Sequence, residues 1–416
     1  MEMKNLKKIT ILLILMTILF ISISAVSAGN FTSLQDDIED SEDSIVLTQD
    51  YLFDNSTDKA YYSGIEIEKA NFSLNGNGHT IDGKSQAKIF EISGYNITIS
   101  NLKLINANCD DSGGAINSRG NITLVNVTFE NNHAKDGGAI FSSGNLNIIN
   151  STFIANSANM GGALKTATSA TITGCTFKNF TDITFSMIYA EKQSNLLIEN
   201  SSFLNSQAKY ATAVYSAGNA VIKKSIFKNL HANETGGAIA IKEGTNLVID
   251  SSTFENTTSV KNAGAIFLDG EDGGTAVTAT INNNKFISTS GDFGGAILNL
   301  GKNIFLCNNS FEKCISLYDG GAIFITQSKN ATIIGNNFTD NVVLNEGDGV
   351  AIYLFETKPT IRQNFFQNNK DNAVYAYSCR NVIVEKSTFI NNTIAVYGVF
   401  SNITCETAVY LMINYP

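Results

Sequence analysis

The chain has 416 residues, of which 43% are hydrophobic and only 16% charged, with 33 glycines, two prolines and no tryptophan. Abundant apolar residues with little charge exclude a disordered chain, because disordered chains replace apolar residues with charge. The net charge of −10 leaves no basic surface for phosphates, so we expect no nucleic-acid partner.

Residues 1–28 have the pattern of a targeting segment. Three lysines precede an apolar run over residues 9–23, and small residues follow as AVSA at 25–28. This pattern predicts a signal peptide cleaved after Ala28. The alternative is an uncleaved anchor, because residues 9–26 are about long enough to span a bilayer. Either way we expect a secreted or cell-surface protein, with membrane contact only through this segment if it is retained.

Residues 29–110 are predicted to close the N-terminal end of the fold. In FTSLQDDIED, Phe31, Leu34 and Ile38 recur with helical spacing, and Thr32 or Ser33 can cap the helix. We expect a short amphipathic helix over the open end of a core. Irregular repeat units follow up to residue 110, and regular units occupy residues 111–416.

From residue 111 onward the sequence repeats. Gly-Gly-Ala stands at 137–139 and again at 161–163, with Phe153 between them. A phenylalanine recurs in the same way at intervals of about 23–32 residues, which is the signature of a repeat architecture. The phenylalanine column comprises Phe129, Phe153, Phe177, Phe203, Phe227, Phe254, Phe286, Phe311, Phe338, Phe366 and Phe389.

Aliphatic residues keep a constant place in each repeat. One stands five residues before the phenylalanine, as Ile148 does before Phe153, and another follows Gly-Gly-Ala or its variants, as Ile140 does. Inward residues two apart indicate strands rather than helices. Each repeat of about 22–32 residues therefore carries three short strands, separated by turns of Asn, Gly, Ser and Asp.

This pattern predicts an all-β fold, a parallel β-helix with a short N-terminal capping helix. Successive coils would stack about 4.8 Å apart, so that Phe lies on Phe and Ile on Ile. Gly-Gly supplies backbone angles that a Cβ forbids at a corner, and Asn tolerates left-handed angles there. A leucine-rich-repeat solenoid is the alternative, but the sequence lacks its leucine signature and its helical halves.

The repeats resemble those of two families of surface proteins. GGA-[ILV] alternating with F-x-x-N, here GGAI at 137–140 and FIAN at 153–156, is similar to the repeat signature of the polymorphic membrane proteins of chlamydiae. The head, from FTSLQDDI through LNGNGHTIDG to NITISNLKLIN, resembles the adhesin-like surface proteins of methanogenic archaea. The resemblance covers about residues 31–405. It implies a right-handed parallel β-helix with an adhesin-like role.

Six cysteines in an exported chain first suggest disulfides. Their spacing is irregular, they form no Cys-x-x-Cys pair, and the three histidines are not placed to complete a zinc site. We therefore expect most cysteines to be small buried hydrophobic residues, and we expect no metal and no cofactor. The chain also carries N-x-S/T sequons that could bear glycans.

Acids beside the glycine corners are the candidates for polysaccharide chemistry, which needs clustered carboxylates. They are Asp111, Asp136, Asp292, Asp319 and Asp348. Counting coils separates Asp136 from Asp319 by about seven coils, so these two cannot converge on one substrate atom. Asp before Gly is also ordinary turn chemistry. We therefore predict no catalytic residue and a protein that is not an enzyme; a carboxylate or calcium site is the alternative.

Two long insertions carry further acids. Glu271 and Asp272 lie in the insertion at 268–278, and Glu346 and Asp348 lie in the one that precedes Phe366. Loops that project from a rigid solenoid often hold binding residues, and these acids could contact cations or sugar hydroxyls. A solvated loop with no ligand is the alternative.

Outward aromatic rings would suit a glycan-binding protein, because flat rings stack on the faces of sugars. Tyr353, Tyr375 and Tyr397 each follow an inward aliphatic residue in successive coils, as Tyr215 does in an earlier one. Alternation points them outward as a stripe with a spacing of about 4.8 Å. We predict a binding site of Tyr353, Tyr375, Tyr397 and Asp348. Packing on the surface of the sheet is the alternative, since Tyr favours strands.

Taken together, these patterns predict an exported, adhesin-like β-helix protein that binds carbohydrate or a cell-surface protein along the solenoid without catalysis. Two alternatives remain open: a polysaccharide-degrading β-helix enzyme, either a lyase or a glycoside hydrolase, and a purely structural envelope protein. Acids from adjacent coils that share a groove would favour the enzyme. Ordered self-assembly would favour the structural protein.

Overall fold

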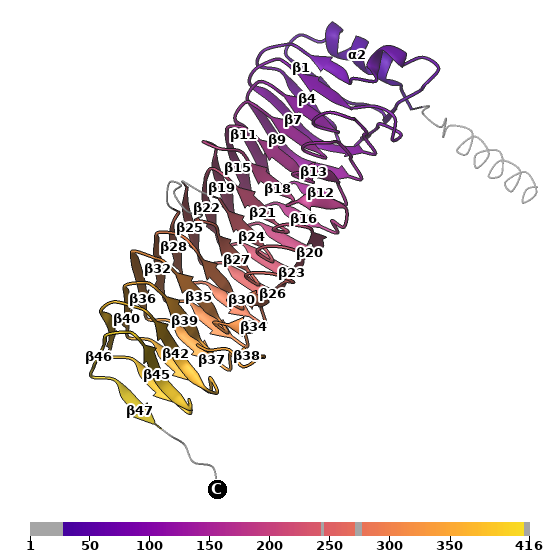
Figure 1. The fold of residues 1–416 in the computed structure, drawn as a ribbon. Helices are drawn as coiled ribbons and strands as arrows, with labels where there is room; N and C mark the ends of the chain where they lie inside the picture. Colours follow the sequence, from indigo (N-terminus) through magenta and orange to yellow (C-terminus); the bar gives the residue numbers. More distant parts are fainter. Residues whose placement is uncertain (1–27, 243–244, 271–276, 412–416) are drawn as a thin grey trace, which may run out of the picture.

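The computed structural model describes residues 28–242, 245–270 and 277–411. Within these ranges the paired strands are parallel, and each pairs with the strands one coil before and one coil after it. Figure 1 shows the resulting elongated stack of coils, with helix α2 (Phe31–Asp40) at one end and strand β47 (Val409–Leu411) at the other. The fold is a parallel β-helix, as predicted.

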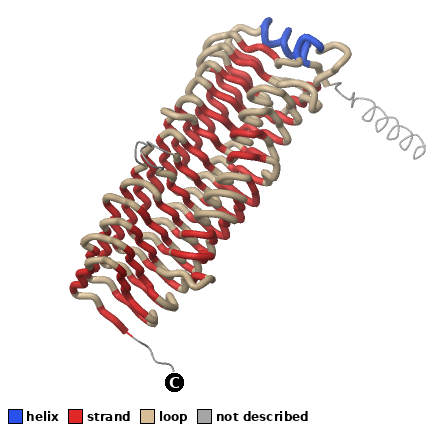
Figure 2. Tube along the Cα trace, in the orientation of Figure 1, coloured by secondary structure: helices blue, strands red, loops and turns tan. Residues whose placement is uncertain are grey.

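Three rows of strands run along the stack, as the red segments of Figure 2 show. The first and second rows belong to one 31-stranded sheet, and the third row is a sheet of 14 strands, both counted over the described residues. Strands β7 (Ile97–Ile105) and β9 (Ile122–Glu130) pass through the corner between the first and second rows.

The remaining strands of the first row are β1 (Ser44–Val46), β4 (Ser73–Asn75), β11 (Leu146–Ile149), β15 (Ser169–Thr173), β19 (Asn195–Glu199), β22 (Asn219–Lys223), β25 (Asn246–Asp250), β28 (Thr278–Asn282), β32 (Asn303–Cys307), β36 (Asn330–Ile334), β40 (Pro359–Arg362), β43 (Val382–Glu385) and β46 (Ile403–Glu406). Those of the second row, besides β47, are β2 (Tyr51–Leu52), β5 (Thr80–Asp82), β12 (Thr152–Ile154), β16 (Thr176–Lys178), β20 (Ser202–Ala208), β23 (Ile226–Ala232), β26 (Thr253–Ser259), β29 (Lys285–Ile287), β33 (Ser310–Glu312), β37 (Asn337–Thr339), β41 (Phe365–Gln367) and β44 (Thr388–Ile390).

The third row comprises β3 (Ile65–Ile67), β6 (Phe90–Ile92), β8 (Ile116–Ser118), β10 (Ile140–Ser142), β14 (Leu164–Thr166), β18 (Ile188–Ala190), β21 (Val214–Ser216), β24 (Ile239–Ile241), β27 (Ile266–Leu268), β31 (Ile297–Asn299), β35 (Ile323–Thr326), β39 (Ile352–Phe355), β42 (Asn372–Tyr377) and β45 (Ile394–Val399). Short strands between the second and third rows are β13 (Ala158–Met160), β17 (Ile183–Phe185), β30 (Ser290–Phe293), β34 (Ile315–Asp319) and β38 (Val342–Val343), and a short 3-10 helix, η1, spans Lys59–Tyr61.

The interior repeats in register, with like residues on like. Phe153 pairs with Phe129 and Phe177, and Ile148 pairs with Leu124 and Ile172. The rings of the phenylalanine column are nearly parallel, and their centroids lie 4.6–4.9 Å apart from Phe129 to Phe389. These side chains are buried, and each contributes about 1.5–3 kcal/mol to folding through its burial.

The corners use the residues that the sequence analysis assigned to them. Gly137, the first glycine of one Gly-Gly-Ala, has a φ of 60°. The second, Gly138, has room for no side chain, because a Cβ there would lie 2.3 Å from the carbonyl oxygen of Gly162. Asn229 and Asn256 have φ values of 55° and 51°, and the Asn256 amide donates to the Asn229 side chain at 3.0 Å. The corners are therefore built from residues that tolerate left-handed angles.

Buried amide ladders run beside the phenylalanine column. Asn336 accepts hydrogen bonds at its Oδ1 from the backbone and side chain of Asn309, both at 2.9 Å. Its own Nδ2 donates to Asn364 Oδ1 at 3.0 Å and to a backbone carbonyl. Such chains satisfy polar groups inside the solenoid and hold each coil in register with the next.

Helix α2 covers the N-terminal end of the core with its three apolar residues buried, as predicted. The predicted cap is wrong: Asn30, not Thr32 or Ser33, is the N-cap. Asn30 Oδ1 accepts from the backbone N–H of Ser33 at 2.8 Å, and the Ser33 hydroxyl accepts from the backbone N–H of Asn30 at 3.0 Å. This reciprocal pair is a capping box, in which Ser33 occupies the third helical position.

All six cysteines are free. Cys175, Cys314 and Cys379 are buried, whereas Cys405 is exposed and the other two are half-buried, so half of them rather than most are core residues. Cys175 and Cys314 are buried because they stand at inward positions in the hydrophobic core, close in sequence to residues of the phenylalanine column. No helix among the described residues is long and apolar enough to cross a bilayer. Residues 1–27 of the predicted signal peptide lie outside the described ranges.

Candidate functional site

In each third-row strand from β10 onward, the residue after the inward aliphatic residue points away from the core, and these residues form one continuous line in register, here called the outer column. Most of its members are aromatic. From β10 to β45 the outer column comprises Phe141, Lys165, Tyr189, Tyr215, Ala240, Phe267, Leu298, Phe324, Tyr353, Tyr375 and Tyr397. An aromatic line on the outside of a solenoid has no part in its core, so it calls for a separate explanation.

The three tyrosines predicted as a ladder do stack. The ring centroids of Tyr353 and Tyr375 lie 5.2 Å apart and those of Tyr375 and Tyr397 lie 5.7 Å apart, and Phe324 extends the ladder at 4.8 Å from Tyr353. Toward the C-terminal end, the distance between successive ring centroids is therefore slightly larger than the predicted 4.8 Å between coils. Figure 1 shows the strands that carry them, β35, β39, β42 and β45, side by side.

The exposure of these rings differs from the prediction. Tyr397 is 47% exposed, but Tyr375 is only 8% exposed and Tyr215 only 9%. A ring that points outward from its strand is therefore not necessarily accessible to solvent, because neighbouring rings of the column cover one another. Burial is also the main reason why the pKa values of Tyr353 and Tyr375 are raised, so both hydroxyls stay protonated at neutral pH and can donate hydrogen bonds.

The middle of the outer column forms a second apolar cluster, separate from the core. Tyr215, Ala240, Phe267 and Leu298 belong to it, and rings from the adjacent corner pack against it. Among these is Phe185, whose ring meets that of Tyr215 edge to face at 5.2 Å. Because the side chains of this cluster cover one another, it is a packed outer layer rather than an open apolar patch.

Two carboxylates from adjacent coils stand beside the tyrosine ladder. Asp319 Oδ1 accepts a hydrogen bond from the backbone N–H of Asp348 at 2.8 Å, and Asp348 Oδ1 accepts one from Asn372 Nδ2 at 3.1 Å. Burial raises the pKa of both carboxyls, and the charge of Asp348 raises that of Asp319 further. The neighbouring Tyr375 hydroxyl favours the ionised form of Asp348. Each aspartate also precedes a glycine with positive φ, which agrees with the predicted turn role.

Asn372, which donates to Asp348, also carries, among the described residues, an unsatisfied hydrogen-bond acceptor beside the two carboxylates. It is 7% exposed, and its Oδ1 is a buried acceptor without a hydrogen-bond partner in the described part of the chain. The predicted site residue Asp348 thus lies with the tyrosines, as expected, and the structure adds Asp319 and Asn372, which were not predicted there. The signal for Asp319 was in the sequence, because its corner is the one that precedes the corner of Asp348.

A buried lysine interrupts the aromatic run nearer the N-terminal end. Lys165 Nζ lies 2.9 Å from Asp136 and 3.0 Å from Glu191, and it lies over the rings of Phe141 and Tyr189. Burial lowers the pKa of Lys165, but the two carboxylates outweigh it and the pKa is raised overall. Asp136 thus forms an ion pair about seven coils from Asp319, so these two acids do not meet. Lys165 was not predicted from the sequence, although it occupies a position that rings fill in other coils.

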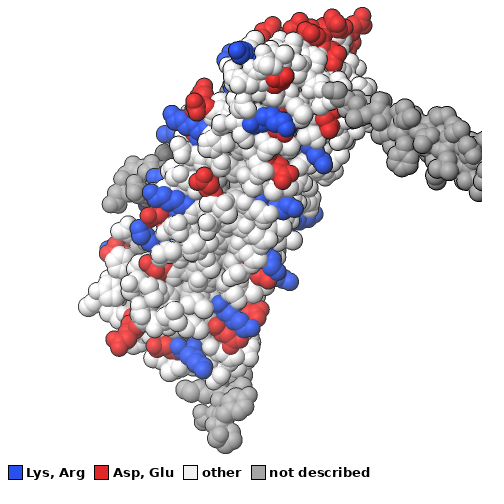
Figure 3. Space-filling model, turned by 90° about the vertical axis from the view of Figure 1, so that its right-hand side faces the viewer, with Lys and Arg blue, Asp and Glu red and all other residues white. Residues whose placement is uncertain are grey.

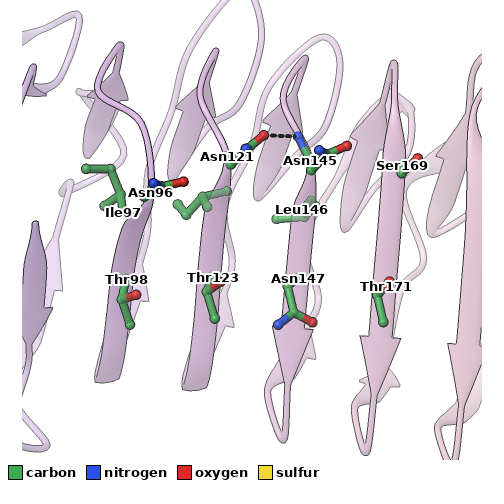
Figure 4. Close-up of a pocket in the computed structure, with 11 residues that line it drawn as sticks. Asn96, Ile97, Thr98, Asn121, Thr123, Asn145, Leu146, Asn147, Ser169 and Thr171 are labelled. Carbon is green, nitrogen blue, oxygen red and sulfur yellow. Dashed lines mark hydrogen bonds between the residues drawn. The ribbon is translucent and has the colours of Figure 1, made fainter. Parts of the chain in front are cut away.

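The first row carries a different, polar groove. Thr98, Thr123, Asn147 and Thr171 point outward from four successive coils, and asparagines line the corner above them (Figure 4). There the backbone N–H of Asn145 donates to Asn121 Oδ1 at 3.0 Å. The groove has a volume of about 490 Å³ and is lined by hydroxyls, amides and aliphatic side chains without a titratable group. It can offer hydrogen bonds but no acid or base.

The acids of the two predicted insertion loops differ in what the structure describes of them. Glu271 and Asp272 lie outside the described residues, and Glu346 is exposed. Across the described ranges, no three His, Cys, Asp or Glu side chains are placed to hold a metal ion. Figure 3 shows one side of the stack, where acidic residues gather at the end that carries α2 and charges of both signs are scattered over otherwise uncharged surface.

A protein-family model described as "Right handed beta helix region" matches residues 161–274 and 237–408. The chain belongs to this right-handed β-helix family. The predicted handedness is thereby confirmed, whereas the resemblance to chlamydial and archaeal surface proteins stays a prediction. No curated protein matches the sequence of this β-helix protein.

Similar solved structures include three proteins that are named for alginate. The periplasmic alginate epimerase AlgG, in a mutant form, is 11% identical with a TM-score of 0.43, and the match covers 91% of this chain and 88% of that one. The alginate lyase AlyF-OU02 with G6 is 12% identical with a TM-score of 0.32 (92% and 83% covered). A PL6 alginate lyase in complex with a trisaccharide is 13% identical with a TM-score of 0.30 (92% and 83% covered). These are similarities of fold.

The prediction that this protein is not an enzyme is corrected. The finding against it is that solved structures similar to this chain are named as an alginate epimerase and alginate lyases. The prediction rested on acids that lie too far apart, and it overlooked Asp319 and Asp348, which lie on adjacent coils in direct contact. Parallel stacking brings equivalent corner residues of neighbouring coils together, although 29 residues of sequence separate them.

Proposed function

We propose that this β-helix protein binds a polysaccharide along its outer column and cleaves it with Asp319 and Asp348. The observation that carries the proposal is the contact between a stacked tyrosine ladder and a carboxylate of the Asp319–Asp348 pair. The Tyr375 hydroxyl lies close enough to Asp348 to influence its pKa, so a ring that can stack on a sugar and a group that can act on its glycosidic bond stand together.

The two carboxyls suit different roles. Burial and the charge of Asp348 keep the pKa of Asp319 raised, which favours the protonated form and suits a general acid. The pKa of Asp348 is also raised, mainly by burial, but the hydrogen bond from Asn372 and the neighbouring Tyr375 hydroxyl oppose that shift, so we assign Asp348 the role of the nucleophile. Because the two residues occupy equivalent positions on adjacent coils, whose backbones lie about 4.8 Å apart, both carboxyls can reach one glycosidic bond, and we propose a retaining reaction. In the proposed reaction Asp319 protonates the leaving oxygen while Asp348 attacks the anomeric carbon; water then releases the sugar.

The proposed setting is outside the cytoplasm. The targeting pattern of residues 1–28 and the resemblance to surface proteins of methanogenic archaea both support export, with a polymer of the cell surface or the surroundings as the partner. We propose that the glycan is neutral. The outer column and its edge hold mainly aromatic rings and charges that are already paired, and the net negative charge of the protein would repel a polyanion.

A product-release assay tests the proposal. Residues 29–416 would be incubated with a panel of neutral and acidic polysaccharides, with and without calcium, and assayed for new reducing ends and for unsaturated ends. We expect new reducing ends from one neutral polysaccharide. Asp319→Asn and Asp348→Asn should each lower the rate at least a hundredfold, whereas Asp111→Asn, an exposed corner acid in another coil, should leave it unchanged.

Binding is tested separately by retention on the same polysaccharides. The triple variant Tyr353→Ser, Tyr375→Ser, Tyr397→Ser should lose retention, while Tyr95→Ser, at a 58% exposed tyrosine away from the ladder, should keep it. Retention without any product would refute cleavage. Product release that persists in the double variant Asp319→Asn, Asp348→Asn would refute the catalytic role of these two carboxyls. Unsaturated ends would show that the reaction is an elimination instead of a hydrolysis.

A further inference from the structure

The outer column has a gap at Ala240. This residue pairs in register with Tyr215 on one coil and Phe267 on the next, so a methyl group stands where the adjacent coils carry rings. The rings on either side of it are two coils apart, which is about 9.6 Å, twice the strand spacing. One ring is therefore missing from the stack, and a pocket of about 290 Å³ lies at that place.

The two ends of this pocket differ in chemistry. At one end Phe185 stacks on Tyr210 at 4.7 Å and closes the pocket with apolar surface. At the other end Lys242 Nζ lies 3.4 Å from Asp269 Oδ2, with the lysine side chain 44% exposed and the aspartate side chain 12% exposed. Thr235 adds a hydroxyl to the lining. The pocket thus combines aromatic walls with a polar edge that both donates and accepts hydrogen bonds.

We propose that this gap is a subsite for one uncharged pyranose residue, which completes the aromatic stack between Tyr215 and Phe267. The C–H faces of a pyranose match aromatic walls, and its hydroxyls match the Lys242–Asp269 edge. Because the two charges of that edge are paired with each other, they complement hydroxyls rather than a carboxylate or an ammonium group. The volume lies at the lower end of ligand pockets, which suits a single sugar. The inference rests on the proposed function, in which the glycan follows the outer column.

The test uses residues 29–416 and four probes: the methyl glycosides of glucose, galactose, mannose and N-acetylglucosamine. Saturation-transfer NMR and calorimetry would measure their binding. We expect millimolar affinity for at least one of them. Ala240→Phe should weaken it at least tenfold by filling the gap, without lowering the unfolding temperature, because adjacent positions already hold rings. Ile226→Phe, which adds a ring at an exposed position of the second row, away from the outer column, should bind as the unchanged protein does.

Two further variants keep the test decisive if Ala240→Phe does not fold. Ala240→Leu places in the gap a side chain that the column already carries at Leu298, and it should weaken binding as well. Asp269→Asn keeps the shape of the edge but removes the acceptor charge, and it should weaken binding several-fold. Unchanged affinity in Ala240→Leu or Ala240→Phe would overturn the subsite.

Two controls separate the possible failures. If a polysaccharide is retained equally by the unchanged protein and by Ala240→Phe, the subsite is refuted while the proposed function stands. If the unchanged protein retains no polysaccharide and releases no product, the proposed function itself fails. Self-association of the unchanged protein that Ala240→Phe abolishes, measured by sedimentation, would show that a second copy occupies the gap, and this also overturns the proposal.

Discussion

Replacing Phe227 by alanine should destabilise the solenoid strongly. Its ring is fully buried and lies between Phe203 and Phe254, with centroid distances of 4.9 and 4.6 Å and planes within 4° of parallel. Burial of the side chain contributes about 1.5–3 kcal/mol, and each aromatic contact adds about 0.5–1.5 kcal/mol. The solenoid cannot collapse around the cavity, because the backbones of neighbouring coils are held by the sheet. We therefore expect a loss of about 3–5 kcal/mol.

The same strand provides a matched control. Ile226 precedes Phe227 in β23 but points outward and is 46% exposed, so Ile226→Ala should cost about 1 kcal/mol or less. Guanidinium denaturation followed by circular dichroism would compare the two variants, and hydrogen exchange would show faster opening of β20, β23 and β26 in Phe227→Ala alone. Equal losses for the two variants would refute the assignment of inside and outside in this row.

Three other predictions follow from buried polar groups and thiols. Asn336→Leu should cost at least about 2 kcal/mol in denaturant unfolding, because it leaves the backbone N–H of Asn309 without an acceptor and removes one of the two acceptors of its side-chain amide; a smaller loss would mean that water replaces Asn336. Lys165→Met should destabilise the protein by about 3 kcal/mol near pH 7. The pKa of Lys165 is raised in the folded protein, so its ion pairs stabilise the fold fully below the ordinary lysine pKa of 10.5 and are lost as the pH rises through the raised value. The stability difference between Lys165→Met and the unchanged protein should therefore shrink above pH 10.5. A difference that stays constant in pH-dependent melts would contradict this. Burial raises the pKa of the Cys314 thiol to about 12, so in the native protein Ellman's reagent at pH 8 should label Cys405 and leave Cys314 unreacted.

The periodicity of the sequence was enough to predict the coils and their register. An aliphatic residue five places before each phenylalanine, and another after Gly-Gly-Ala, can be buried together only if strands of successive repeats lie on one another. The helix over residues 31–40 was predicted for the same reason, because apolar spacing is a local property. Its cap was not, since Asn30, Thr32 and Ser33 are all good caps and only the backbone angles select one of them.

The candidate site was predicted in part. Alternation placed Tyr353, Tyr375 and Tyr397 on the outside in one line, and it could not show that Tyr375 would be nearly covered. Exposure depends on how side chains from several coils lean over one another, which no single repeat encodes. The exclusion of catalysis failed for a similar reason, because it compared distant corners and passed over the contact between Asp319 and Asp348.

The sequence by itself determined the architecture of this protein: a parallel β-helix, its three inward lines of residues and its glycine and asparagine corners, because each follows from a repeated local pattern. The tertiary structure alone decided where chemistry can occur. The ion pairs of Lys165, the carboxyl pair beside Tyr375 and the gap at Ala240 all arise between residues of neighbouring coils, roughly 25 to 30 positions apart. Insertions change the length of each coil, so only the stacked coordinates show which side chains meet.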